Sequence, residues 1–207
     1  GFDSSKLNKY SIGNISIYPD LQLDTAGLAR KETIVGNVKV ISYRNMFKPK
    51  ILPDNIFLRQ KDLYDQRNYF RTINRFNSLS AWRLTSIEQL ARKDLDTADF
   101  IIRLTPARKY SFVANLEGSR NNNTVSGNLF GIAVNVGLQN RNFARAANLS
   151  STNIRFGVET GRDTATDIKF IQTRQLSINH TFLFPRSIPR MNWLPEKIRN
   201  SFRTVLA

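Results

Sequence analysis

The feature that most limits the fold is an alternation of side-chain character along the second half of the chain. From residue 107 onward, bulky apolar residues recur at every second position in runs of about ten residues. Helical periodicity returns only in the last dozen residues. A period of two is the pattern of β-strands, because successive side chains of a strand point to opposite faces. The sequence therefore predicts a series of strands for this half.

The apolar positions share one parity in every run. The clearest run spans 128–138, and its even-numbered positions are Phe130, Ile132, Val134, Val136 and Leu138. The odd-numbered positions of the same run are mostly small or polar. Similar runs occupy 110–118, 154–159 and 175–184, and the polar stretches between runs, which we predict as turns, are 119–124, 139–142 and 161–167.

Two kinds of β-structure fit this alternation. A soluble sandwich buries one face of each sheet, and a membrane barrel turns its apolar face to lipid. The runs approach the roughly 9–11 residues of a tilted membrane strand. Their second face is small or polar rather than strongly charged, as a water-filled lumen requires. These two details favour the barrel, and the soluble sandwich stays open as the alternative.

The first half of the chain has a mixed pattern. Residues 10–18 alternate as a strand that ends at Pro19-Asp20, and 33–43 has the pattern of a short hairpin with Gly36-Asn37 at its bend. Residues 49–57 allow a short helix, whose length Pro53 limits. The clearest helix begins after Asp65 as N-cap, with Tyr69, Ile73 and Phe76 on one face and Phe70 and Leu79 widening the stripe.

Two strands follow the helix. They are predicted at 82–92 and 99–105, with a polar turn at 93–98 and Pro106 as the end of the second strand. The order of elements in the first half is therefore β, α, α, β, β.

Charge and composition exclude several classes of function. The net charge is +15, but residues 1–106 carry 17 basic and 11 acidic groups and residues 107–207 carry 14 and 5, without long basic runs. Nucleic acid is therefore not expected as a partner, because it binds to clustered basic residues. The chain has no cysteine, so disulfides and thiolate metal sites are excluded.

No constellation of catalytic residues emerges. His180 is the only histidine, and it lies on an otherwise apolar strand face. Five aspartates occur at predicted turns: Asp62, Asp65, Asp94, Asp96 and Asp99. Phosphate-binding and dinucleotide-binding glycine motifs are missing. We therefore expect neither an enzyme nor a cofactor or metal site.

Read as a whole, the chain resembles the outer-membrane protein assembly factors of the BamA/TamA type, in the form found in Bacteroidetes-like envelopes. The likeness covers roughly residues 10–186. The segments that carry it are Tyr10–Ile15, Phe57–Tyr64, Thr72–Leu79, Ile101–Pro106, Gly118-Ser119 with Gly127, Gln139–Phe143 and Phe182–Arg186. Two segments depart from the family pattern: Gln60-Lys61 replaces Pro-Gly, and Ala146-Ala147 replaces Gly-Glu.

The resemblance implies an architecture and a location. Residues 1–9 would be a leader or linker and 10–106 one α+β POTRA-type domain (β-α-α-β-β) in the periplasm. Residues 107–207 would be the first antiparallel strands of a transmembrane β-barrel in the outer membrane. Because such a barrel needs more strands than the four or five found here, the resemblance implies that the chain is a fragment of a longer protein.

The resemblance also implies two surfaces that bind extended chains. The first is the edge strand of the POTRA-type domain, formed by Arg83, Leu84, Thr85, Ser86, Ile87, Glu88, Gln89 and Leu90. The second is the strand at the barrel seam, with Tyr110, Phe112, Ala114, Leu116 and Gly118. The expected partners are unfolded outer-membrane protein clients, other envelope assembly subunits and the lipid bilayer. A related secretion barrel and a soluble β-rich module for an acidic ligand are the alternatives.

Overall fold

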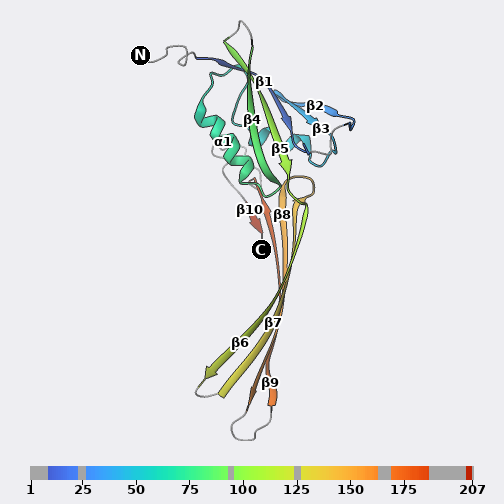
Figure 1. The fold of residues 1–207 in the computed structure, drawn as a ribbon, viewed down its shortest axis with the longest axis vertical. Helices are drawn as coiled ribbons and strands as arrows, with labels where there is room; N and C mark the ends of the chain where they lie inside the picture. Colours follow the sequence, from blue (N-terminus) through green and yellow to red (C-terminus); the bar gives the residue numbers. More distant parts are fainter. Residues whose placement is uncertain are drawn as a thin grey trace, which may run out of the picture. The chain divides into compact units, whose positions relative to one another are not determined.

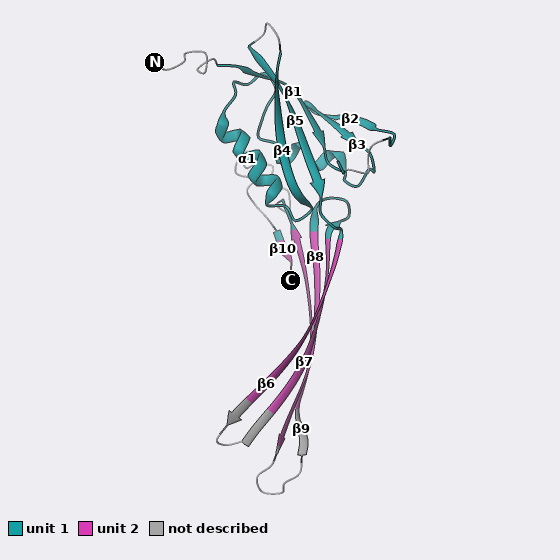
Figure 2. Cartoon of the chain, viewed as in Figure 1, with its two compact units in different colours: residues 1–109, 141–148, 184–204 teal, residues 110–140, 149–183, 205–207 magenta. Residues whose placement is uncertain are grey.

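The structure is a computed structural model that describes residues 9–22, 27–92, 96–123, 127–162, 169–186 and 204–206. The chain forms two compact units, coloured separately in Figure 2. Unit 1 comprises residues 1–109, 141–148 and 184–204, and unit 2 comprises 110–140, 149–183 and 205–207. Most of the described chain is antiparallel β-structure. The domain boundary expected after residue 106 stays a prediction.

Unit 1 contains a five-stranded sheet and one α-helix in its described residues (Figure 1). The sheet order is β2-β3-β1-β5-β4, with β1 parallel to both of its neighbours. In chain order the elements are β1 (Ser11–Tyr18), β2 (Lys31–Val35), β3 (Val38–Ser42), the 3-10 turns η3 (Pro49–Ile51) and η4 (Pro53–Asn55), α1 (Gln66–Asn77), β4 (Trp82–Ala91) and β5 (Thr97–Pro106).

Most elements expected in the first half are present. The strand at 10–18, the hairpin with its bend at Gly36-Asn37 and the strand at 82–92 are confirmed. Asp65 caps α1, because its side chain accepts a hydrogen bond from Arg67 N at 2.9 Å. The strand expected at 99–105 begins two residues earlier, at Thr97. Half of the turn expected at 93–98 lies outside the described residues, and Thr97 and Ala98 belong to β5 instead.

The expected order β, α, α, β, β is not confirmed. The first helical segment is reduced to η3 and η4, since Pro49 and Pro53 each start a three-residue turn and remove backbone donors. The hairpin β2–β3 adds two strands, so the sheet has five strands rather than three. A turn near Gln60 forms without glycine, because Lys61 takes a left-handed conformation with φ 72°.

The core of unit 1 lies on one face of this sheet. Ile17, Ile102 and Leu104 are fully buried there, and α1 contributes Phe76, whose ring meets Trp82 edge-on at 5.4 Å. Tyr69 and Ile73 pack against this cluster as the helical spacing predicts. Phe70 is half exposed, and Leu79 is buried but lies beyond the end of the helix.

Unit 2 is built on a sheet in the order β10-β9-β8-β7-β6 (Figure 1). Its strands are β6 (Tyr110–Asn123), β7 (Gly127–Phe143), β8 (Asn148–Arg162), β9 (Lys169–Phe184) and the short β10 (Thr204–Leu206). No helix in the described part of the chain is long and apolar enough to cross a membrane.

The four long strands exceed their predicted lengths. The turns expected at 119–124 and 139–142 were wrong, because 119–123 and 139–142 continue β6 and β7. In both places the strands contain runs of polar residues. The sequence alone does not distinguish such a run from a turn. Most of the turn expected at 161–167 lies outside the described residues. So do most of the last dozen residues, where the sequence has helical periodicity but the described 204–206 form β10.

Candidate functional site

Strand β4 lies at one end of the five-stranded sheet, and within the described residues its only strand neighbour is β5. In an antiparallel pair, alternate residues direct their backbone groups to the neighbouring strand. The hydroxyl of Tyr69 donates a hydrogen bond to Ile87 O at 3.3 Å, so this carbonyl points away from β5. Arg92, next to the end of β4, donates its N–H to Thr97 O at 3.0 Å. Even-numbered Arg92 therefore bonds towards β5, and odd-numbered Ile87 bonds away from it. The outward backbone groups of β4 thus belong to its odd-numbered residues.

The eight residues predicted for client binding divide between the two faces of β4. Thr85 and Ile87 are buried on the side of the core, whereas Leu84 and Leu90 are 61% and 44% exposed. Glu88 forms an ion pair with Arg103 at 2.8 Å on the open face of the sheet. Arg83, Ser86 and Gln89 are exposed. An incoming chain would thus meet exposed apolar side chains beside outward backbone groups.

A group of tyrosines borders the same edge. Tyr10 and Tyr64 stack with ring centroids 4.8 Å apart, and Gln89 joins both through its side-chain amide, at 3.2 and 3.3 Å. Burial, followed by the interaction with Tyr64, raises the pKa of Tyr10 to about 12. The two stacked rings are thus held beside β4 by the side chain of Gln89. The sequence did not single out Tyr10 and Tyr64, because their proximity depends on residues far apart in the chain.

The second predicted strand, β6, lies at an end of the sheet in unit 2. Its pairing with β7 sets Phe112 opposite Leu138, Ala114 opposite Val136 and Leu116 opposite Val134. The five residues predicted for the barrel seam, Tyr110, Phe112, Ala114, Leu116 and Gly118, all lie on β6 and are exposed. Their role in binding clients stays a prediction.

Apolar residues form a continuous exposed face across unit 2. In the pairs β6–β7 and, up to Glu159, β8–β9, even-numbered residues lie opposite even-numbered residues. Odd-numbered Gly157 of β8 and Ala133 of β7 adjoin on the other face, so the apolar positions of the four strands share one side. Leu116 and Phe112 are 76% and 66% exposed. Eight further large side chains of this face are at least two-fifths exposed, namely Phe130, Ile132, Val134, Leu138, Ile154, Phe156, Leu176 and Ile178.

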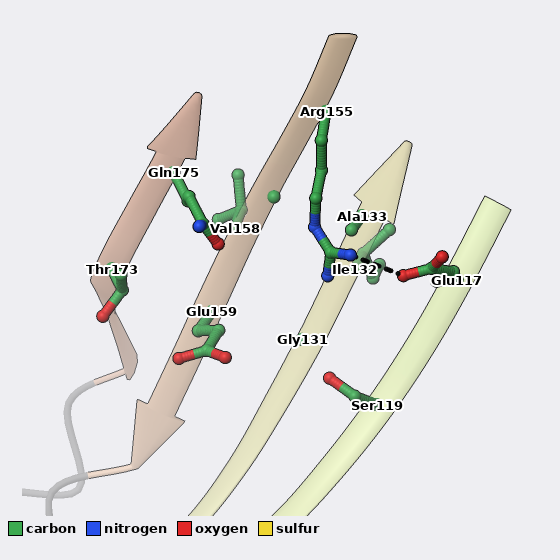
Figure 3. Close-up of a pocket in the computed structure, with 11 residues that line it drawn as sticks. Glu117, Ser119, Gly131, Ile132, Ala133, Arg155, Val158, Glu159, Thr173 and Gln175 are labelled. Atoms are coloured by element: carbon green, nitrogen blue, oxygen red, sulfur yellow. Dashed lines mark ion pairs between the residues drawn. The ribbon is translucent and has the colours of Figure 1, made fainter. Parts of the chain in front are cut away.

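The opposite face of unit 2 is polar and has a floor of small residues (Figure 3). The guanidinium of Arg155 reaches across β7 to the Glu117 carboxylate at 3.2 Å, and Asn135 donates a hydrogen bond to the same carboxylate at 2.6 Å. A Cβ atom on Gly131 would stand 2.5 Å from the Ser119 hydroxyl oxygen, so glycine at this position leaves space for the Ser119 side chain. One sheet thus separates an apolar face from a polar face that carries an ion pair.

Several residues that the sequence offered for catalysis make local contacts in the described part of the chain. His180 contacts Thr152 Oγ1 at 2.7 Å and Ser150 Oγ at 3.5 Å. Asp65 is the helix cap and Asp99 is ion-paired, while Asp94 lies outside the described residues. Within the described ranges, no three potential metal ligands of the His, Asp and Glu type gather.

Asp99 instead fastens β5 to an irregular stretch of β1. Arg92 holds its carboxylate with two hydrogen bonds, at 2.7 and 3.0 Å, and Asn14 N donates a third at 2.6 Å. The carboxylate lies where a Cβ atom on Gly13 would stand, which explains the glycine at the register shift between Ile12 and Ile15. The hydrogen bonds from Arg92 hold the pKa of Asp99 below its ordinary value, although burial opposes them.

We expect the stability of unit 1 to depend on this carboxylate in acid. A lowered folded-state pKa stabilises the fold above the unfolded pKa of about 4, and this contribution is lost as the pH falls through the folded value. Urea unfolding of the parent and of Asp99→Asn, followed by Trp82 fluorescence in a Trp193→Phe background, should differ at pH 7, and the difference should disappear as the pH falls below the folded-state pKa of Asp99. Asp62→Asn, at an exposed turn, is the control. A difference that stays constant with pH would contradict the assignment.

Comparisons with known proteins give structural matches only. No family model and no curated protein matches the chain. One similar solved structure is BamA from Haemophilus ducreyi lacking POTRA domains 1–3, with 9% identity, a TM-score of 0.35, and coverage of 76% of this chain and 37% of that chain. Another is CdiB from Acinetobacter baumannii, with 11% identity, a TM-score of 0.42, and coverage of 83% and 25%. This chain thus spans well under half of either protein, and TM-scores this low carry no functional information.

Proposed function

We propose that this protein acts at the bacterial outer membrane, in the insertion or secretion of other proteins. More specifically, we propose an assembly factor in which unit 1 receives unfolded barrel proteins on β4 and unit 2 contributes strands to a membrane barrel. In this scheme unit 1 lies in the periplasm. In the same scheme, the protein binds its clients and other envelope assembly subunits mainly through backbone groups.

The exposed apolar face of unit 2 is the observation that carries this proposal. A soluble protein rarely leaves so large an apolar surface uncovered, because its contact with water costs free energy. From Phe130 to Leu138 the apolar residues of β7 span eight steps, or about 27 Å at about 3.4 Å per residue. A strand tilt of about 40° reduces this length to about 21 Å along the membrane normal, near the roughly 25 Å of a barrel's lipid-facing band.

The polar face supports the same assignment. Arg155, Glu117 and Asn135 satisfy one another within a single layer, as side chains that face a water-filled lumen do. The edge at β6 needs a further strand in lipid, because unpaired backbone groups are costly there. That strand would come from the rest of a barrel or, transiently, from a client.

The edge at β4 supports a role in binding extended chains. Its outward backbone groups can pair with a strand of almost any sequence, which suits a factor with many clients. The exposed Leu84 and Leu90 would add apolar contacts on the open face. Because the backbone supplies most of the affinity, we expect weak sequence selectivity.

Gel migration of the protein from envelope fractions tests the membrane assignment. We expect extraction to require detergent and migration to change on boiling, because folded barrels resist denaturation by detergent until they are heated. A protein that is soluble in buffer and unaffected by boiling would overturn the proposal and favour a soluble module for an acidic ligand.

Depletion of the protein tests the finer assignment. An assembly factor should leave several folded outer-membrane barrels at reduced abundance. If depletion lowers the abundance of one exported protein and leaves the barrels unchanged, the result would contradict an assembly function and favour a function in secretion.

A further inference from the structure

The turn between β7 and β8 (144–147) belongs to unit 1 together with the adjoining strand ends, so that residues 141–148 are one segment of that unit, although both strands continue into unit 2 (Figure 2). Three of its residues, Ala144, Arg145 and Ala147, have positive φ values of 57°, 59° and 55°. Side chains with a Cβ atom rarely adopt this left-handed conformation, because it brings Cβ close to the backbone. A turn that holds three such residues needs surrounding contacts that impose its shape.

Those contacts come from the loop that follows β3. Asn142 donates its side-chain N–H to Met46 O at 2.9 Å, and its side-chain oxygen accepts Ala147 N at 3.1 Å. Lys48 N donates to Arg145 O at 2.9 Å, and the Arg145 guanidinium donates to Asn45 O. One asparagine thus satisfies the turn and the loop together.

The turn also closes the apolar core of unit 1. Asn142, Ala146 and Ala147 are between 4% and 6% exposed, and Ala147 belongs to the same buried cluster as Phe47 and Trp82. Residues nearly a hundred positions apart in the sequence therefore share one core. If the turn were absent, part of this cluster would face water.

The receiving loop also has hydrogen bonds that do not involve the turn. Asp20 is fully buried, and its carboxylate accepts the Ser42 hydroxyl at 2.6 Å, Tyr43 N at 3.0 Å and Arg44 N at 2.8 Å. The Ser42 hydroxyl in turn accepts Asn45 N at 2.9 Å. This network fixes the loop so that the Asn45 and Met46 carbonyls can serve as acceptors.

We propose that loop 43–48 is a docking surface whose partner is the chain's own segment 141–148, which carries the turn 144–147, and that unit 1 reaches full stability only with this segment in place. Asn142 is the central contact, and the left-handed residues give the turn a shape that fits the loop. Neither statement depends on the proposed membrane function. It follows that residues 10–106 do not form a self-sufficient domain.

Unfolding of the full chain, followed by Trp82 fluorescence in a Trp193→Phe background, tests this proposal. Asn142→Ala leaves Met46 O and Ala147 N without their partner, so the unfolding constant of unit 1 should rise roughly tenfold. Asn115→Ala, at an exposed position in unit 2, should leave the Trp82 transition unchanged. Equal transitions for the parent and Asn142→Ala would overturn the proposal.

A second variant should act in the opposite direction. Ala144 is exposed, so Ala144→Gly removes backbone strain without removing a core contact, and the unfolding constant reported by Trp82 should fall several-fold. Ala91→Gly, at an exposed position without positive φ, should leave stability unchanged or lower it. If the unfolding constant reported by Trp82 is the same in Ala144→Gly as in the parent, the turn is not coupled to the core.

Discussion

Val134→Arg is expected to prevent stable incorporation of the protein into membranes. Val134 lies within the exposed apolar face of β7, opposite Leu116 on β6. An arginine at the centre of a lipid-facing band costs about 2–4 kcal/mol, which is a large share of the stability of a typical domain. The measurement is the fraction of detergent-extracted protein that shows heat-modifiable migration.

Asn179→Arg is the matched control for this variant. Asn179 is exposed on the polar face of β9, where a lumen would be hydrated, so the same charge should be tolerated. Equal loss of membrane incorporation in both variants would remove the distinction between a lipid face and a lumen face. Full incorporation of both would have the same meaning.

Gln89→Pro should weaken the binding of unfolded clients roughly a hundredfold, since it removes an outward N–H and places a ring where an incoming strand would lie. Position 89 is odd-numbered, so the ladder to β5 should lose no hydrogen bond. Binding can be measured by photo-cross-linking from a reactive residue at the exposed position of Leu84. Retention of the Trp82 signal would confirm that unit 1 is folded.

Gln89→Ala separates the backbone from the side chain. It removes the amide contacts to Tyr10 and Tyr64 and keeps the backbone N–H, so client binding should persist. If alanine weakens binding as much as proline does, the tyrosine group rather than the strand edge is the binding surface. If neither variant has an effect, clients bind elsewhere.

The face of each long strand could be predicted from the sequence because parity is a local property. Phe130 and Leu138 share a face in any strand that contains both. The ends of the strands could not be predicted, since Ser119 and Asn142 are as common in turns as in a hydrated strand face. Only pairing with a neighbouring strand, Ser119 with Gly131 for example, distinguishes the two.

The candidate site was less accessible from sequence. Residues 82–92 were predicted as a strand from their composition, but their place at the sheet edge depends on the order of all five strands. The hairpin β2–β3 widened the sheet at the far side and left β4 at the edge. The sequence marked Ala146-Ala147 only as a departure from Gly-Glu. Neither the positive φ values of the turn nor its contact with loop 43–48 could be predicted, because alanine is common in helices and strands.

The position of β1 has a mechanical consequence. This strand lies between β3 and β5 and runs parallel to both. Tension applied between residue 10 and residue 106 would therefore load the hydrogen bonds of β1 in shear, so that many must break together instead of one after another. Unit 1 should therefore resist tension along this axis better than tension that pulls β4 away from β5 at one end. In the second case the hydrogen bonds between β4 and β5 can break one after another.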